Sequence, residues 1–330
     1  MSFPWPDDEP LRFDRFMEAA LFDPERGYYT RSINAVGKGG DFTTTAMISP
    51  ALGKAVAGWA LAALKETGCR HLIELGPGEG TLAKAVLAGI PWLRRLGIQL
   101  HLVERSAPLR EKQAALLKGR VRWHDSIGEA LEAAGGRACI YSNEFPDAFP
   151  VRRFRRTETG WSELYLAPGN PAAEIWIPET ELPKSASLDD TCAIGQTVEV
   201  HESFRSWWQE WLPDWQAGRM LTIDYGAEAE RLYYRRPKGS LRGYFMQQRV
   251  EGPAAYANPG RQDLTADVNF TDLALWAEPY ARVRRLQSQR DFLLPWVSPE
   301  NAADAYAINP EGPGEAFQVI EHEAAACARP

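Results

Sequence analysis

Three closely spaced glycines follow a short apolar segment in the first third of the chain, in the sequence His71-Leu-Ile-Glu-Leu-Gly-Pro-Gly-Glu-Gly-Thr-Leu-Ala83. The pattern predicts a buried strand that ends in a tight turn and continues into a helix. Glycine suits such a turn because the backbone visits positive φ, and because no Cβ then separates the backbone amides from a ligand at the helix N-terminus. The segment is therefore predicted to bind a nucleotide. An ordinary glycine-rich turn is the alternative.

The spacing of the glycines discriminates between nucleotide ligands. A dinucleotide site requires Gly-x-Gly-x-x-Gly or Ala, but here the third glycine is Gly80 and the required position holds Thr81. Nicotinamide and flavin cofactors are therefore disfavoured. The arrangement resembles motif I of class I S-adenosylmethionine (SAM) methyltransferases. This resemblance implies that Gly76, Gly78 and Gly80 line a SAM site and that Glu74 offers its carboxylate to the ammonium group of the methionyl part.

Acidic residues end the next two predicted strands. Glu104 follows residues 99–103, where a carboxylate suits hydrogen bonding to the two ribose hydroxyls of an adenosine. A solvated glutamate is the alternative. Asp125 and Ser126 follow residues 121–124, at a position where SAM enzymes of this class commonly bind the exocyclic amine of adenine. An ordinary helix cap explains this pair equally well.

Two carboxylates and an amide follow the fourth predicted strand, which covers residues 137–142. Ligands of open α/β sheets bind at the carboxyl ends of the strands, so we expect Asn143, Glu144 and Asp147 to face the same crevice as the glycine turn. Asn143 is assigned to the cofactor site. Glu144 and Asp147 are assigned to catalysis, because paired carboxylates suit a cationic methyl acceptor. The alternative is that Asp147 caps a turn and Glu144 is solvated.

Composition restricts the class of partner. The chain has 330 residues, 45% of them hydrophobic, and a net charge of −7, which argues against nucleic acid and favours a basic protein segment. The N-terminus lacks the features of a signal or transit peptide, and no apolar stretch is long enough to enter a membrane as a span, so a cytoplasmic location is expected. No metal spacing occurs among the four cysteines, which are Cys69, Cys139, Cys192 and Cys327.

The alternation of strands and helices predicts an α/β fold with a doubly wound, mostly parallel, Rossmann-like sheet. Four regions are expected. They are an N-terminal cover (1–50), the first part of the SAM-binding core (51–150), an inserted α+β cap (151–217) and the rest of the core (218–330). Helices are predicted at 50–67, 82–89, 108–118 and 204–215, a hairpin turning at 157–160, a fifth strand at 220–226, and the last strands of the sheet within 241–250 and 282–294.

An ordered series of segments through most of the chain resembles the MidA-type SAM-dependent methyltransferases. The segments are Phe16–Tyr29, Gly37–Ser49, the glycine turn, Val103–Ser106, Leu109–Gln113, Asn143–Pro150, Trp161–Glu163, Ile223–Gly226, Gly239–Tyr244 and Asp263–Phe270. The mitochondrial member of this family is a complex I assembly factor that dimethylates an arginine of a complex I subunit. The resemblance implies SAM as cofactor, contacts from Gly40 and Thr43 to SAM, and a protein substrate such as a respiratory complex subunit.

The chain departs from this family at two places. Pro146 and Phe149 stiffen the loop after the fourth strand, and Gln247 and Gln248 occupy the neighbourhood of a histidine that is common in the family. Because glutamine cannot accept a proton as imidazole does, the use of a general base is left open. A small-molecule methyltransferase, a SAM-binding assembly factor and a nicotinamide oxidoreductase, which Thr81 disfavours, remain alternatives. A homodimer is also left open.

Overall fold

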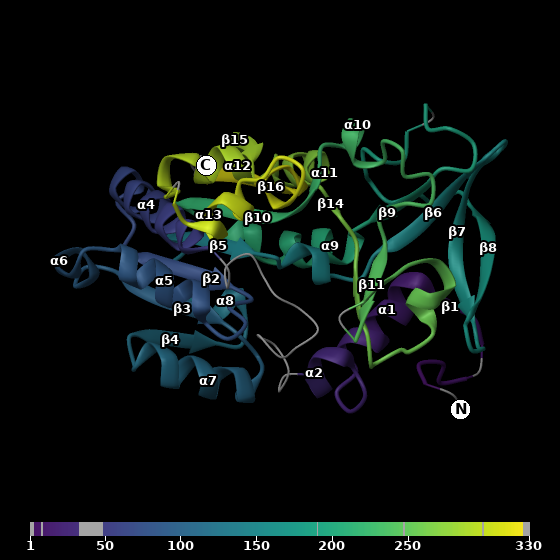
Figure 1. Cartoon of the computed structure of the whole chain (residues 1–330), viewed down its shortest axis with the longest axis horizontal. Helices are drawn as coiled ribbons and strands as arrows, with labels where there is room; N and C mark the ends of the chain where they lie inside the picture. Colours follow the sequence, from purple (N-terminus) through teal and green to yellow (C-terminus); the bar gives the residue numbers. More distant parts are fainter. Residues whose placement is uncertain are drawn as a thin grey trace. The chain divides into compact units, whose positions relative to one another are not determined.

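The computed structural model describes residues 3–7, 9–32, 49–189, 191–246, 248–298 and 300–325. The chain forms two compact units, and the elements of each are labelled in Figure 1. Unit 1 comprises Met1–Phe42, Pro146–Trp207 and Gly226–Leu273, and unit 2 comprises Thr43–Phe145, Trp208–Tyr225 and Ala274–Pro330. The four regions predicted from sequence, with boundaries after residues 50, 150 and 217, remain predictions.

A mixed sheet forms the centre of unit 2, with its strands in the order β15-β16-β10-β5-β2-β3-β4. Five neighbouring strands are parallel, and the two at one edge are antiparallel. This arrangement confirms the predicted doubly wound, mostly parallel fold. The parallel strands are β2 (His71–Leu75), β3 (Gln99–Val103), β4 (Val121–His124), β5 (Ala138–Asn143) and β10 (Arg219–Ala227), and the others are β15 (Ala281–Ser288) and β16 (Phe317–Ala324).

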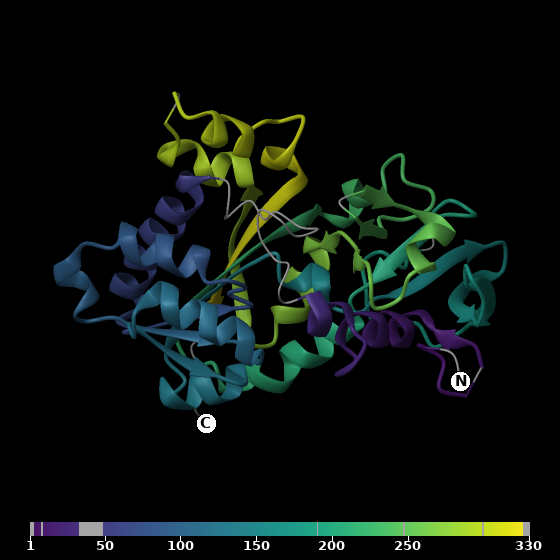
Figure 2. The same cartoon turned by 60° about the horizontal axis from the view of Figure 1, so that its bottom comes forward.

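Helices of unit 2 cover the sheet (Figures 1 and 2). The first of them, α4, packs closely on α5 because small residues line the contact, where a Cβ on Gly53 would lie 2.4 Å from Ala85 Cβ. The helices predicted at 50–67, 82–89 and 108–118 are confirmed to within a residue. The helical elements are α4 (Pro50–Thr67), α5 (Thr81–Gly89), α6 (Trp92–Arg95), α7 (Ala107–Leu117), α8 (Ile127–Ala133), η2 (Leu212–Asp214), α12 (Gln289–Leu293), η4 (Leu294–Trp296), α13 (Ala302–Ala307) and α14 (Pro313–Ala316).

Unit 1 contains two smaller sheets and its own apolar core, in which Phe13, Phe16 and Tyr256 pack together. The predicted hairpin is confirmed, since β6 and β7 pair and turn between Thr157 and Gly160. The elements are β1 (Leu11–Arg12), α1 (Phe13–Phe22), α2 (Tyr28–Ser32), η1 (Pro146–Ala148), β6 (Arg152–Thr157), β7 (Gly160–Ala167), β8 (Ala173–Glu179), β9 (Thr197–Val200), α10 (Ala229–Leu232), β11 (Arg242–Phe245), β12 (Gln248–Val250), η3 (Gly252–Tyr256), β13 (Asp263–Thr265) and β14 (Val268–Asn269).

Two helices contain a boundary between the units. They are α9 (Glu202–Trp211) and α11 (Phe270–Ala277). The amphipathic helix predicted at 204–215 corresponds to α9 followed by η2. Its Phe204, Trp208, Trp211 and Trp215 are all buried, so these apolar groups pack in the core.

The prediction of the last strands of the sheet is wrong in part. Residues 241–250 form β11 and β12, which pair with each other and with β13 in a separate sheet. Within the segment 282–294, strand β15 ends at Ser288, and helix α12 follows it. The Ser288 hydroxyl caps α12 by accepting a hydrogen bond from the Asp291 amide. The strand β16, between β15 and β10, was not predicted. Period-two patterning indicates a strand but does not say which sheet it joins.

No helix among the described residues is long and apolar enough to cross a membrane.

Candidate functional site

The register of the sheet in unit 2 aligns the predicted cofactor residues in one row. Leu75 pairs with Val103 and with Ser142, and Val103 pairs with His124. The residues that follow these four positions are Gly76, Glu104, Asn143 and Asp125. Because the strands are parallel, these residues all lie at the carboxyl edge of the sheet, as the sequence predicted.

The glycine turn has the backbone that the sequence requires. Gly76, Gly78 and Gly80 have φ values of 60°, 53° and 82°, which side chains other than glycine rarely adopt. A Cβ on Gly76 would lie 2.5 Å from the Phe145 ring, whereas a Cβ on Gly78 would meet no atom of the described residues within 4 Å. Gly80 forms the N-cap of α5. The turn therefore leaves open space at Gly78, in front of a helix N-terminus.

Glu74 is buried on β2, and its Oε2 accepts a 2.7 Å hydrogen bond from the Tyr141 hydroxyl on β5. Burial raises the pKa of this carboxyl to about 8, and the bond from Tyr141 offsets only part of that rise. A cation held beside Glu74 would favour the charged form and lower this pKa again. The geometry thus fits the predicted contact with an ammonium group.

Glu104 lies directly after β3, and its Oε1 accepts a hydrogen bond from the Ser106 amide at 2.8 Å. Burial raises the pKa of its carboxyl above the ordinary value, opposed chiefly by that bond. Arg110 donates through Nε to the Glu104 carbonyl oxygen and through Nη2 to Asp125 Oδ1, both at 2.6 Å. Ser126 caps α8 by accepting the Glu129 amide. Its contact with a cofactor, and that of Asp125, remain predictions.

Gln113 fixes the glycine turn, a role that the sequence did not reveal. Its side chain is fully buried, with Nε2 donating to the Gly78 carbonyl oxygen at 2.6 Å and Oε1 accepting from Trp123 Nε1 at 2.7 Å. An indole can only donate and a carbonyl can only accept, so the amide has one possible orientation. Gln113 also helps to lower the pKa of Glu104. One side chain therefore joins the glycine turn to Trp123 on β4.

Glu144 follows β5 in a strained backbone conformation, with φ of 53°. A non-glycine residue in this region costs of order 1–3 kcal/mol and is commonly found at active sites. The Glu144 amide donates to the Ile223 carbonyl oxygen at 2.9 Å, and Asn143 Nδ2 donates to Glu144 Oε1 at 2.9 Å. Asn143 Oδ1 is buried and has no hydrogen-bond partner among the described residues. An amide oxygen of this kind is available to a ligand.

Asp224 holds the backbone after Glu144, which the sequence also did not predict. Its Oδ2 accepts the Phe145 amide at 3.2 Å and its Oδ1 accepts the Tyr225 amide at 2.8 Å. The residue is fully buried. It directly follows Ile223, which pairs with Asn143, and it lies within β10, so the rule that ligand residues follow the carboxyl ends of strands does not point to it.

Asp147, the second predicted catalytic residue, belongs to unit 1. Its Oδ2 accepts a 2.9 Å hydrogen bond from the Thr265 hydroxyl, and Tyr29 donates to Asp263 in the same unit at 3.1 Å. Burial raises the pKa values of both carboxyls, and the charge of Asp147 raises that of Asp263 further. The role of Asp147 in catalysis remains a prediction.

Gly40, Thr43, Gln247 and Cys327 lie outside the described residues. The residues that are described fit SAM, because the open space at Gly78, the buried carboxyl of Glu74 and the unpaired Oδ1 of Asn143 are features that a polar ligand would occupy. Within the described ranges no cluster of histidine, cysteine, aspartate and glutamate side chains could hold a metal ion.

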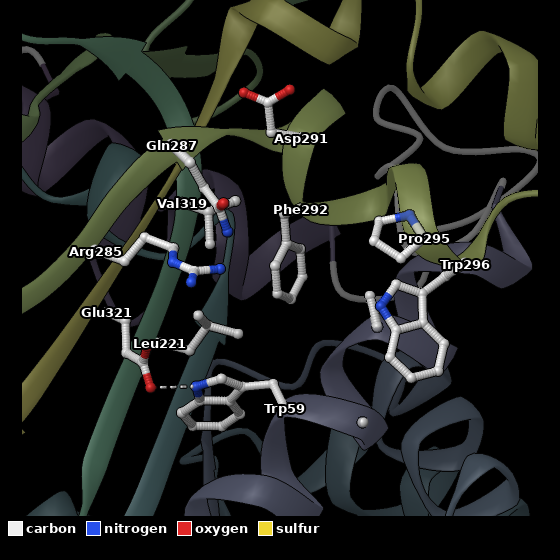
Figure 3. A pocket seen from close by; sticks show the side chains of 12 residues that line it. Trp59, Leu221, Arg285, Gln287, Asp291, Phe292, Pro295, Trp296, Val319 and Glu321 are labelled. Carbon is white, nitrogen blue, oxygen red and sulfur yellow. Dashed lines mark hydrogen bonds between the residues drawn. The ribbon is translucent and has the colours of Figure 1, made fainter.

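A cavity of about 280 Å³ lies elsewhere in unit 2, between α4, the β10-β16-β15 part of the sheet and η4 (Figure 3). Trp59 in its wall donates from Nε1 to Glu321 Oε1 at 2.9 Å. Trp296 packs so closely on Gly58 that a Cβ there would lie 2.3 Å from the ring. The cavity contains none of the predicted cofactor residues.

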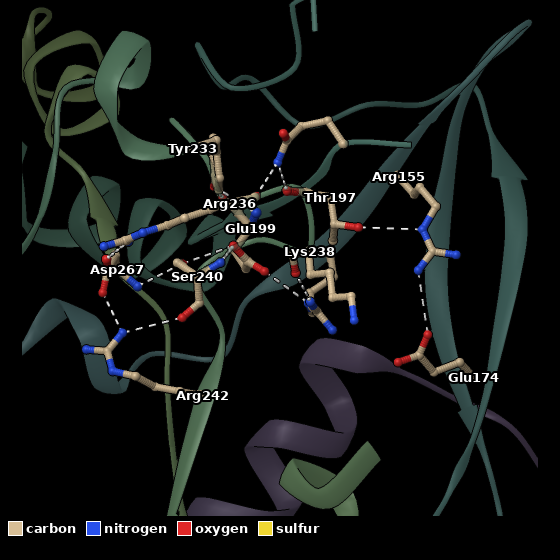
Figure 4. A network of polar contacts seen from close by, with 12 residues as sticks. Arg155, Glu174, Thr197, Glu199, Tyr233, Arg236, Lys238, Ser240, Arg242 and Asp267 are labelled. Carbon is tan, nitrogen blue, oxygen red and sulfur yellow. Dashed lines mark hydrogen bonds and ion pairs between the residues drawn. The ribbon is translucent and has the colours of Figure 1, made fainter. Parts of the chain in front are cut away.

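A network of charged side chains lies in unit 1 (Figure 4). Glu199 is buried and accepts hydrogen bonds from Arg153 Nε at 3.0 Å and from the amide and hydroxyl of Ser240 at 2.9 and 3.0 Å. Asp267 accepts from Arg236 and Arg242. Nearly every polar atom of this network is paired, which is the pattern of a structural element.

The chain is similar to known methyltransferases. Residues 55–287 match the family model described as "Putative S-adenosyl-L-methionine-dependent methyltransferase". The protein arginine methyltransferase NDUFAF7, mitochondrial, of Danio rerio is 27% identical over 94% of this chain and 82% of its own length. The Mus musculus protein of the same name is 28% identical over 86% and 70%.

A solved structure is also similar over nearly the whole chain. It is a COG1565 superfamily member from Burkholderia thailandensis, bound to S-adenosyl-homocysteine. This protein is 25% identical, covers 96% of this chain and 88% of its own length, and superposes with a TM-score of 0.79.

Proposed function

The chain belongs to this family of SAM-dependent methyltransferases, and we propose that its methyl acceptor is an arginine side chain of a protein substrate. The names of the relatives, which are protein arginine methyltransferases, support this acceptor. The net charge of −7 suits a basic substrate segment. The family resemblance makes a respiratory complex subunit the first protein to test, and a cytoplasmic location remains part of the proposal.

The observation that carries the proposal is the geometry of Glu144. Its carboxylate follows β5 on a strained backbone that Ile223 and Asp224 hold in place, one residue beyond the row of cofactor residues. A carboxylate is the group best suited to a guanidinium, because two parallel hydrogen bonds fix the plane of the cation. Strain is retained in a folded protein where the surrounding structure enforces it, commonly for function.

Each residue then has a role in methyl transfer. The glycine turn, Glu74, Glu104 and Asn143 would hold the cofactor, which supplies an electrophilic methyl group on a sulfonium when bound. Glu144 would orient one guanidinium nitrogen and stabilise the positive charge that the acceptor carries through the reaction. For Asp147, which belongs to unit 1, a role in catalysis stays a prediction from the sequence.

Incubation of the enzyme and labelled SAM with lysate of a source strain that lacks the gene tests the acceptor. Mass spectrometry should locate new methyl groups on arginine. Methyl groups on lysine, on a carboxylate or on small metabolites would contradict the proposal while leaving SAM dependence intact.

The variant Glu144→Gln tests the catalytic assignment, because it keeps the shape of the side chain and removes its charge. The rate of methyl transfer should fall by roughly one and a half to three decades, equivalent to about 2–4 kcal/mol, with SAM affinity unchanged. Glu111→Gln is the matched control, since Glu111 is an exposed carboxylate on α7 of the same unit. Equal rates in the two variants would show that Glu144 is peripheral.

A further inference from the structure

The loop between α5 and β3 carries three highly exposed apolar side chains. Trp92, Leu93 and Leu96 expose 67%, 64% and 80% of their surface, and no residue of α6 is buried. Contiguous exposed apolar groups mark contact sites in soluble proteins, because water opposes such exposure. The cofactor site does not use this loop, since it precedes β3 and therefore lies at the amino edge of the sheet.

The loop has a defined structure that presents these side chains. The Arg94 amide donates to the Pro91 carbonyl oxygen at 2.9 Å, and the Gly97 amide donates to the Arg94 carbonyl oxygen at 3.1 Å. Arg95 Nε donates to the Ile90 carbonyl oxygen at 2.6 Å, which ties the loop to the end of α5. In both views α6 stands at one end of unit 2 (Figures 1 and 2). We call residues 91–97 the apolar tip.

Cationic residues gather at the same edge. Arg70, Arg120 and Arg137 each directly precede a parallel strand, namely β2, β4 and β5, and Arg94 lies in the tip itself. All four are exposed. Within the described part of the chain, none of these four guanidinium groups forms an ion pair. An acidic protein therefore presents unpaired positive charge around its apolar tip.

We propose that the apolar tip binds the surface of a membrane that contains anionic lipids. Tryptophan and leucine side chains insert at the boundary between headgroups and acyl chains, and arginines bind the lipid phosphates. The two contributions together give stable binding to a membrane surface. A stable protein interface needs about 800 Å² on each partner, more than a tip built on one helical turn offers. The net charge of −7 disfavours nucleic acid as the partner.

This binding mode would leave the active site accessible. The glycine turn and Glu104 lie at the carboxyl edge of the same sheet, opposite the edge that carries the tip. A membrane-bound enzyme would therefore turn its cofactor site away from the lipid.

Vesicle flotation with the full-length chain tests the proposal. We expect the protein to float with vesicles made of equal parts phosphatidylcholine and phosphatidylglycerol, and much less with phosphatidylcholine alone. Raising the ionic strength should reduce flotation, because salt screens the arginines. Failure of the wild-type chain to float with the mixed vesicles would overturn the proposal.

Variants of the apolar tip test whether this segment is responsible for membrane binding. The double variant Trp92→Ser/Leu96→Ser should reduce partitioning by about tenfold or more, with thermal stability and methyl transfer in solution unchanged. Ile194→Ser is the matched control, since Ile194 is 69% exposed but belongs to unit 1. The variant Arg70→Gln/Arg94→Gln/Arg120→Gln should lose the preference for anionic vesicles.

Two outcomes would contradict the inference. The first is flotation of the Trp92→Ser/Leu96→Ser variant equal to that of the wild type. The second is a dimer in sedimentation velocity that this variant abolishes, without flotation of the wild type, which would mean that a second copy of the chain covers the tip.

Discussion

Acidic side chains are buried both at the carboxyl edge of the sheet in unit 2 and in the charged network of unit 1. The two regions differ in how many hydrogen bonds these buried side chains form. Glu74 has a single hydrogen bond, from Tyr141, and Asn143 Oδ1 has none among the described residues. Glu199 accepts three hydrogen bonds from Arg153 and Ser240. A buried polar group that lacks partners costs free energy. Buried polar groups with few hydrogen bonds at the edge of the sheet therefore indicate a ligand, whereas the complete hydrogen bonding of Glu199 in unit 1 indicates a structural role.

The largest effect is expected from breaking the saturated network. Arg153→Met leaves Glu199 buried without its cation, and should lower the free energy of unfolding by about 3–5 kcal/mol. Urea unfolding measures the loss. Arg249→Met is the control, because Arg249 pairs with Glu251 on the surface, where both side chains are about 60% exposed, and such pairs are worth at most about 1 kcal/mol. Equal losses in the two variants would mean that the network does not stabilise unit 1.

The next effect concerns the open space at Gly78. Gly78→Val should reduce SAM affinity by about a hundredfold or more, because the new side chain would occupy the position predicted for the ligand and would strain the turn. Gly119→Val is the matched control, since Gly119 also has a positive φ, of 72°, and no atom of the described residues lies within 4 Å of the added Cβ. Calorimetric titration should show binding in the control. Wild-type affinity in Gly78→Val would place the cofactor elsewhere.

A pH-dependent effect should distinguish the two regions further. The pKa of Glu74 is about 8 in the folded protein, above its ordinary value. Its contribution to stability is therefore complete at pH values below about 4.5 and is lost as the pH rises through about 8. Glu74→Gln mimics the protonated form, so without SAM it should become more stable than the wild type at pH 9, by about 1–3 kcal/mol. A stability difference that does not change between pH 5 and pH 9 would contradict this.

The smallest effect is expected at Gln113. Gln113→Met removes the hydrogen bond to the Gly78 carbonyl oxygen, and a bond worth about 1 kcal/mol corresponds to roughly fivefold weaker SAM binding. The KM for SAM should rise while kcat is unchanged, because the residue positions the turn and does not contact the acceptor. A fall in kcat at an unchanged KM would exclude this role.

The positions of the residues at the carboxyl edge could be predicted from sequence, because they depend on the local backbone and on the ends of single strands. Gly76, Gly78 and Gly80 adopt positive φ, as their spacing indicated, and Glu104 and Asn143 lie at the carboxyl ends of neighbouring parallel strands. Such residues follow from two rules that need only strand positions.

The remaining features depend on contacts between distant segments. The bonds that Gln113 makes to Gly78 and Trp123 join three elements, and those of Glu199 join β6, β9 and residue 240. The prediction that residues 241–250 join the large sheet was wrong for the same reason, because the alternation of side chains along a strand does not identify its partner strand. Only tertiary structure reveals these pairings.

Calorimetric titration of SAM into the wild type and into Glu104→Ala tests most directly whether the carboxyl edge of the sheet is the cofactor site. If Glu104 binds the ribose as predicted, the variant loses two charge-assisted hydrogen bonds, each worth roughly 1.5–3 kcal/mol. Affinity should therefore fall by at least about tenfold, while the midpoint of urea unfolding without ligand stays close to that of the wild type. Unchanged affinity in a folded Glu104→Ala protein would contradict the assignment of this edge to SAM.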